Sequence, residues 1–191
     1  MLDENKNYIV SGLERSGTSL MMQILEAGEI PVAYDNSRKS DKSNKMGYFE
    51  LEGGKIISTL AKAEFPMDDY FGRFIKITSY GIQFLPMDGR KYEVIYMIRN
   101  MDEIIESSIQ MGAEVKNKEE MRTTLEILQL KALQQICTNP HISYQPIYYN
   151  RLLKKETRKN ELEWIKKRYS EFDMEAAEKV IDESLYRSRR K

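Results

Sequence analysis

The sequence predicts an α/β fold, a three-layer α/β/α sandwich whose central sheet is mainly parallel. Short apolar runs alternate along the chain with segments of helical periodicity, which is typical of βαβ units with helices on both faces of a sheet. The 191 residues fit one domain spanning 1–191, and the chain shows no internal repeat or low-complexity linker. We therefore expect a single folding unit.

The apolar runs and the helical segments give the predicted elements in order. The strands are expected at Tyr8–Ser11, Ile30–Ala33, Arg73–Ile77, Glu93–Ile98 and Ile142–Tyr149. The helices are expected at Thr18–Ala27, Gly54–Ala63, Asp102–Met111, Lys118–Ile136, Glu161–Tyr169 and Met174–Asp182. Capping-box spacing supports three helix starts, at Asn100 with Glu103, Asn117 with Glu120 and Asn160 with Glu163. Pro146 interrupts the last strand, so that strand is either an edge strand or begins later.

The most informative segment runs from Tyr8 to Leu20, where an apolar run is followed by a glycine-bracketed loop and then by helical spacing. Such a loop directs backbone N–H groups and a helix N-terminus toward one point, which suits a phosphate-like dianion. The spacing of Gly12 and Gly17 matches a Walker A loop, but Thr18 stands where that motif has lysine. The positive charge lies inside the loop instead, at Arg15.

With this displaced charge, residues 12–19 resemble the loop by which the sulfotransferase family holds the 5′-phosphosulfate of PAPS (3′-phosphoadenosine 5′-phosphosulfate). The resemblance implies a P-loop NTPase-like fold. It also implies that Arg15, Ser16, Gly17, Thr18 and Ser19 bind the co-substrate and that Arg15 takes part in catalysis. The family commonly has proline where this chain has Glu14, and an acidic side chain beside an anion is unfavourable if it points inward.

A second segment, residues 99–107, is similar to another part of the same family. The apolar run Tyr92–Ile98 ends at Arg99, and Ser107 follows eight residues later on the predicted helix. Sulfotransferases hold the 3′-phosphate of the nucleotide with an arginine and a serine at this spacing, so the resemblance implies this role for Arg99 and Ser107. The alternative is that Arg99 is an ordinary surface arginine and Ser107 a solvated helix residue.

Sulfuryl transfer to a hydroxyl needs fixed donors at the leaving oxygen and a general base at the acceptor. Cytosolic sulfotransferases use a histidine shortly after a lysine in the segment before a Leu-Pro, but Lys76–Pro86 has no histidine. The segment 45–50 resembles a Gly-aromatic-aromatic-Glu stretch of bacterial relatives. By comparison with tyrosylprotein-type sulfotransferases we expect Glu50 to be the base, or else a glutamate near the start of a solvated helix. Lys76 either bridges the leaving oxygen and the sulfuryl group or pairs with a carboxylate at a strand end.

Three other features each have a plainer interpretation. His141, the one histidine, is expected to be a surface or structural residue. The polar segment 35–45 is a solvated loop or, alternatively, a lid that borders the acceptor site. The basic segment 184–191 resembles a Leu-aromatic-Arg tail of bacterial relatives and is either solvated or screens a nucleotide phosphate.

Composition restricts the class of protein further. Lysine plus arginine equals aspartate plus glutamate, so no global field would attract nucleic acid. The single cysteine, Cys137, excludes an intramolecular disulfide and fits a reducing compartment. Because no apolar stretch is long enough for a signal peptide or a membrane span, we expect a cytoplasmic protein without membrane attachment, similar to the bacterial soluble sulfotransferases or to an isolated catalytic domain. One histidine and one cysteine cannot form the usual zinc sites, so no metal is expected.

The sequence thus predicts a PAPS-dependent sulfotransferase that moves a sulfuryl group to a hydroxyl of an unidentified acceptor. PAPS, its desulfated product PAP and this acceptor are the expected partners, and no motif indicates an oligomeric state. A catalytically inactive nucleotide- or anion-binding P-loop protein is one alternative. A P-loop phosphotransferase is another, against which the missing Walker lysine argues.

Overall fold

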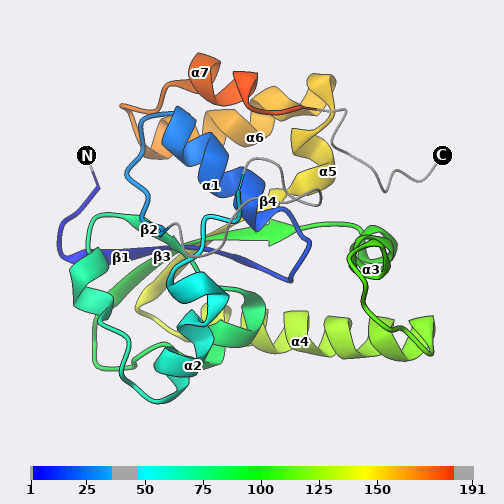
Figure 1. Cartoon of the computed structure of the whole chain (residues 1–191). Helices are drawn as coiled ribbons and strands as arrows, with labels where there is room; N and C mark the ends of the chain where they lie inside the picture. The colour runs from blue at the N-terminus through cyan, green and yellow to red at the C-terminus, as the bar shows by residue number, and fades with distance from the viewer. Residues whose placement is uncertain (1, 36–46, 183–191) are drawn as a thin grey trace.

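The computed structural model describes residues 2–35 and 47–182, in which parallel strands form one four-stranded sheet (Figure 1). The strands are β1 (Lys6–Gly12), β2 (Phe74–Lys76), β3 (Lys91–Ile98) and β4 (Ile142–Tyr148), in the order β2-β1-β3-β4. All three pairings are parallel, and β1 pairs with β3 over its whole length. The carboxyl ends of all strands therefore lie at one edge of the sheet, and β1 ends between β2 and β3.

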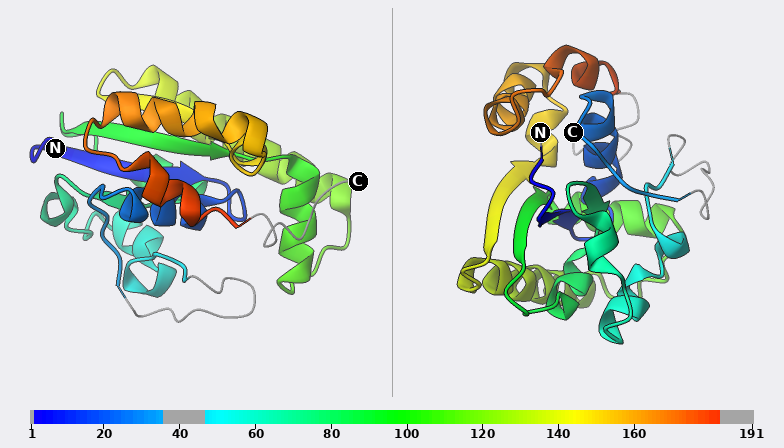
Figure 2. Two further views of the ribbon diagram at one scale, coloured as in Figure 1. Left: turned by 90° about the horizontal axis from the view of Figure 1, so that it is seen from above. Right: turned by 90° about the vertical axis from the view of Figure 1, so that its left-hand side faces the viewer.

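Helices cover both faces of this sheet, as the sequence predicts for a three-layer sandwich (Figures 1 and 2). One face carries α1 (Thr18–Ala27), α5 (Tyr149–Leu152), α6 (Lys155–Arg168) and α7 (Met174–Lys179), and the other carries α2 (Ile56–Ala61) and α4 (Lys118–Thr138). Short 3₁₀ turns form η1 (Glu52–Gly54), η2 (Met67–Tyr70) and η3 (Ser79–Phe84). Helix α3 (Met101–Gln110) lies beyond the carboxyl end of β3.

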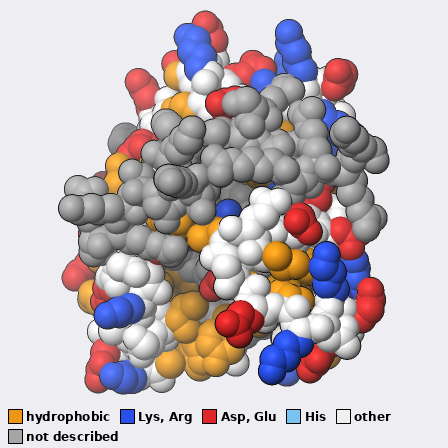
Figure 3. Space-filling view, turned by 45° about the vertical axis from the view of Figure 1, so that its right-hand side comes forward, with side chains coloured by type: hydrophobic (Ala, Val, Ile, Leu, Met, Phe, Trp, Pro, Cys, Tyr) orange, Lys and Arg blue, Asp and Glu red, His pale blue; other side chains and the backbone are white. Residues whose placement is uncertain are grey.

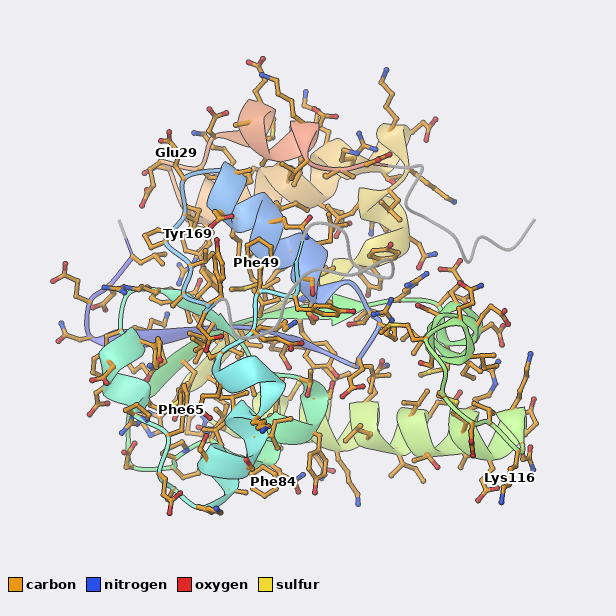
Figure 4. The ribbon with its side chains drawn as sticks, viewed as in Figure 1. Glu29, Phe49, Phe65, Phe84, Lys116 and Tyr169 are labelled. Atoms are coloured by element: carbon orange, nitrogen blue, oxygen red, sulfur yellow. The ribbon has the colours of Figure 1, made fainter. Side chains whose placement is uncertain are left out.

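Each face of the sheet has its own hydrophobic core. Alternate residues of β1 point to opposite faces, so Val10 packs in the core under α1 and Ile9 in the core over α2 and α4. Phe49 and Tyr169 lie on the first side of the sheet, and Phe65 and Phe84 on the second (Figure 4). Because both faces are covered, six consecutive residues of β3, 92–97, are buried.

Most predicted elements are confirmed, and α1 has the predicted bounds. The predicted strand Ile30–Ala33 is wrong, because this segment makes only the isolated bridge Val32↔Phe74. Pro31 lacks an N–H group and cannot extend the pairing. Of the two alternatives for the strand containing Pro146, the edge position is confirmed, since β4 lies at the end of the sheet, and a later start is wrong, since β4 begins at Ile142.

Two of the three predicted helix caps are confirmed and one is wrong. Asn100 and Asn117 cap α3 and α4, each accepting two backbone N–H groups on its side chain. Asn160 is not a cap, because α6 begins earlier, at Lys155, and Lys154 stands at its N-cap without a side-chain cap bond. Other ends differ by a few residues; for example, Tyr149 belongs to α5 rather than to the last strand, α2 is shorter than predicted at both ends, and α7 ends at Lys179.

A buried ion cluster at the amino edge of the sheet stabilises the fold away from the loop. Glu93 of β3, 3% exposed, accepts from Arg168 at 2.7 Å through two nitrogens, from Lys6 at 2.5 Å and from the Tyr169 hydroxyl at 2.5 Å. Burial would raise the pKa of Glu93, but the hydrogen bonds from Arg168, Lys6 and Tyr169 outweigh it and hold this pKa at about 2. The carboxylate therefore stays ionised in the fold.

Two surface properties bear on partners. Over the described part of the face in Figure 3, acidic and basic side chains are interspersed and do not gather into one basic area. Within residues 2–35 and 47–182, none of the helices combines the length and the apolar character needed to cross a bilayer.

Candidate nucleotide-binding site

The loop between β1 and α1 is shaped by two glycines that no larger residue could replace without displacing neighbours. A Cβ atom on Gly12 would lie 2.5 Å from Ser16 Oγ and 2.7 Å from the carbonyl oxygen of Met97 on β3. Gly17, the N-cap of α1, has a left-handed φ of 103°, and a Cβ atom there would lie 2.3 Å from the Tyr149 ring. The loop thus follows a close path against β3 and α5.

This path places several hydrogen-bond donors at the start of α1. The first N–H groups of an α-helix have no partner within the helix and point out of its N-terminus, which favours an anion. The amide of Ser16 is used inside the loop, where it donates to the Leu13 carbonyl at 3.1 Å. Ser16 is 1% exposed, and its hydroxyl, like that of Ser11, has no hydrogen-bond partner among the described residues. This buried hydroxyl lies within the loop, next to Gly12.

Glu14, the departure from the family pattern, is exposed to solvent. Its side chain is therefore not buried within the loop.

The second predicted segment contacts the loop directly. Arg99 donates to the backbone carbonyl of Arg15 at 2.8 Å, and Arg15 Nε donates to Ser107 Oγ at 3.0 Å. The Arg99 side chain is only 7% exposed and forms an ion pair at 3.1 Å with Glu103, itself buried. Ser107 is buried too, so the alternative of a surface arginine and a solvated serine is wrong. Residues separated by more than 80 positions in the sequence thus meet at the carboxyl edge of the sheet.

Two residues of this cluster were not predicted. The Arg99 guanidinium lies 4.4 Å from the centre of the Tyr149 ring, a cation–π distance. Asn150 Nδ2 donates to both Glu103 carboxylate oxygens, at 3.1 and 3.0 Å, and its Oδ1 accepts from the backbone of Asn100. The sequence predicts Tyr149 only as the last residue of a strand. The one signal for this pair is its position directly after a strand, at the edge where the other polar residues gather.

Lys76 and Glu50 meet on the other side of the loop. Lys76, at the end of β2 with a side chain 4% exposed, pairs with Glu50 at 2.8 Å, contacts Ser19 Oγ at 3.3 Å and donates to the Tyr48 carbonyl. Ser19 donates its own hydroxyl to that same carbonyl at 3.1 Å. Glu50 precedes η1 and is 14% exposed, so it is not a glutamate on a solvated helix. Both catalytic candidates therefore lie next to the first turn of α1.

The remaining predicted features lie elsewhere. His141 is exposed and precedes β4, so it occupies the edge of the sheet opposite to the loop. The segments 35–45, apart from Asp35, and 184–191 lie outside the described residues. In the described part of the chain, no three His, Cys, Asp or Glu side chains gather closely enough to hold a metal ion. That no metal takes part stays a prediction.

Comparison with known proteins gives similarity in structure but not in sequence. No protein-family model matches the chain, and no curated protein matches it. It is similar to a crystal structure of retinol dehydratase in complex with androsterone and inactive cofactor PAP, with a TM-score of 0.50 and 13% identity over 97% of this chain. This chain spans 65% of that one. It is also similar to an unliganded sugar kinase from Janibacter sp. HTCC2649, with a TM-score of 0.40, 14% identity, and coverage of 93% of this chain and 99% of the kinase.

The similarity to retinol dehydratase and the geometry of the loop agree on the fold. A strand, a glycine-bracketed loop and a helix follow one another at the centre of a parallel sheet, which is the arrangement of P-loop proteins. The fold is α/β, a three-layer sandwich of the P-loop-like kind.

Proposed function

We propose that this chain binds PAPS and transfers its sulfuryl group to a hydroxyl of an acceptor molecule. One observation carries the proposal, namely that the loop 12–19 and the pair Arg99 and Ser107 meet at the carboxyl edge of the sheet. These are the two segments that resemble the two phosphate-binding segments of the sulfotransferases. The PAP in the retinol dehydratase complex supports the proposal, because PAP is the nucleotide that remains after PAPS has given up its sulfuryl group.

The nucleotide would lie across the start of α1 and the end of β3. The amides of the first turn of α1 and the buried Ser16 hydroxyl would donate to the 5′-phosphosulfate, since a helix N-terminus favours negative charge. Arg99 and Ser107 would donate to the 3′-phosphate. Gly17 allows the close approach of the backbone that such binding needs.

Glu50 and Lys76 would act on the acceptor side. As the acceptor oxygen bonds to sulfur and the bond from sulfur to the phosphate oxygen breaks, Glu50 would take the hydroxyl proton and Lys76 would stabilise charge on the leaving oxygen. Their ion pair in this structure places both groups beside Ser19, at the start of α1. The pair has to separate for Glu50 to take a proton, and a bound phosphosulfate would offer Lys76 another partner.

Thermal unfolding with PAP and with ATP plus magnesium tests the binding step. PAP at a hundredfold excess over its Kd should stabilise the fold by about 2.7 kcal/mol. ATP with magnesium should stabilise the fold less at the same concentration, because it has no 3′-phosphate. Stabilisation by ATP with magnesium and none by PAP would contradict the proposal and favour a phosphotransferase.

A second function, nucleotide binding without transfer, is favoured by the engagement of Glu50 with Lys76. A carboxylate held by an ammonium group must first release it to act as a base. PAP binding together with no release of PAP from PAPS, in the presence of a broad set of phenols, alcohols and tyrosine peptides, would support this second function. Turnover with any of these acceptors would exclude it.

A further inference from the structure

Both the backbone and the side chain of Arg15 contact the segment that is expected at the 3′-phosphate. The backbone of Arg15 has a left-handed φ of 67°, uncommon for a residue with a Cβ atom. The turn presents the Arg15 carbonyl to Arg99, and the side chain reaches α3, where Nε donates to Ser107 Oγ. Backbone and side chain of Arg15 therefore both contact the pair expected at the 3′-phosphate.

The bond to Arg15 also prepares Ser107 to donate. A serine hydroxyl has one proton to give and accepts through its lone pairs. Because Ser107 accepts from Arg15, its own proton is directed elsewhere, and no acceptor for it is found among the described residues. Its neighbour Ser108 instead donates to the Ile104 carbonyl at 2.9 Å, as serines inside helices commonly do. The Ser107 hydroxyl can thus donate to a ligand, whereas the Ser108 hydroxyl donates within the helix.

The charges at this point fit a phosphate. The Arg15 guanidinium contacts Ser107 and the Arg99 guanidinium contacts the Arg15 carbonyl, both in part-buried places, and Glu103 is a carboxylate that pairs with Arg99. A guanidinium has five donors in a planar fork, a geometry that matches phosphate oxygens. A dianionic group at this position would be held by three donors from two segments of the chain.

We infer that Arg15 is a specificity-determining residue for the 3′-phosphate of the nucleotide, acting with Arg99 and Ser107, and does not serve the 5′ end. The inference rests on the proposed function and specifies how the site selects nucleotides that carry a 3′-phosphate. Recognition at the 5′ end is then left to the start of α1, the Ser16 hydroxyl and Lys76. Arg15 would thus make the protein bind PAP in preference to nucleotides that lack a 3′-phosphate.

The test is calorimetry with PAP, 5′-AMP and 3′-AMP, in which each AMP lacks one of the two phosphates of PAP. The variants are Arg15→Ala, Arg15→Lys and Ser107→Ala, with Ser108→Ala as the matched control. Arg15→Ala should weaken PAP and 3′-AMP roughly 10- to 100-fold, the loss of a hydrogen bond to a charged group, and leave 5′-AMP nearly unchanged. Ser107→Ala should give the same pattern with a smaller loss, and Ser108→Ala should change none of the affinities.

Three outcomes overturn the inference, and a fourth overturns the proposed function instead. A loss in Arg15→Ala that falls on PAP and 5′-AMP but spares 3′-AMP would return the residue to the 5′ end. An equal loss for all three nucleotides would mean that the substitution only disturbs the loop. If Arg15→Ala does not fold, Ser107→Ala and Arg15→Lys carry the test, and unchanged preference for PAP over 5′-AMP in both would overturn the inference. Equal affinity of the wild-type protein for PAP and 5′-AMP would instead refute the proposed function at its binding step.

Discussion

The contact between Gly17 and the Tyr149 ring gives the sharpest prediction about the loop. In Gly17→Ala the new methyl carbon would lie 2.3 Å from the ring, a separation that forces the ring or the loop to move. Gly89 provides the control, because its φ of 90° is also left-handed and a Cβ atom there meets nothing within 4 Å. The two substitutions share the backbone strain and differ in the collision.

The magnitudes follow from these two terms. A residue with a Cβ atom in the left-handed region costs about 1–2 kcal/mol, and forcing extra volume into a packed site costs about 1–3 kcal/mol more. Gly89→Ala should therefore lower the free energy of unfolding by the first amount only, and Gly17→Ala by both. The effect of the lost glycine on the unfolded chain is the same in the two variants and cancels in the comparison.

Urea unfolding measures the collision as a coupling energy between Gly17→Ala and Tyr149→Ala. It requires the two single variants, their double variant and the control Gly89→Ala. Removing the ring should restore about 1–3 kcal/mol, so that the cost of Gly17→Ala falls to that of Gly89→Ala. Equal destabilisation by Gly17→Ala and Gly89→Ala in the wild-type background would refute the reasoning, since the ring would then have no effect.

Three further predictions concern other parts of the molecule. The pKa of Glu93 is about 2 in the fold and 4.5 ordinarily, so its contribution to stability, about 3 kcal/mol, is present above pH 4.5 and is lost as the pH falls toward 2. The urea midpoints of wild type and Glu93→Gln should therefore differ most at neutral pH and converge in acid. A difference that stays constant with pH would contradict this pKa. Glu50→Gln should lower turnover roughly 10²- to 10⁴-fold with little change in PAP affinity, measured once an acceptor is known; full activity would remove Glu50 as the base. Asn100→Ala should destabilise the fold by about 1 kcal/mol through loss of the α3 cap, whereas Asn100→Asp, which keeps an acceptor, should cost less by thermal unfolding.

The sequence was sufficient for the elements with strong local signals. The bounds of α1, the caps at Asn100 and Asn117, and the edge position of the strand with Pro146 all depend on residues close together in the chain. The prediction of a strand at Ile30–Ala33 was wrong because an apolar run does not show how far a segment can pair with a neighbouring strand. Pro31 limits this segment to a single bridge. That the whole of 1–191 forms one domain stays a prediction.

The site shows the same division between local and distant information. The loop and the pair Arg99 and Ser107 were predicted from motifs, but no motif states that the side chain of Arg15 reaches Ser107 on α3. Tyr149 and Asn150 were missed because their roles depend on contacts with Gly17 and Glu103, which are more than 40 positions away. Such contacts come from the order of strands in the sheet, and spacing along the chain does not contain them.

The proline in the edge strand has a consequence for how copies of this chain meet. The amide of Tyr92 donates to the carbonyl of His141, and alternate residues of a strand direct their backbone groups to opposite sides, so residue 146 faces away from β3. If a strand of another molecule paired with β4, Pro146 could not donate a backbone hydrogen bond to it, because proline has no N–H group. The open edge of the sheet therefore carries its own obstacle to edge-to-edge aggregation.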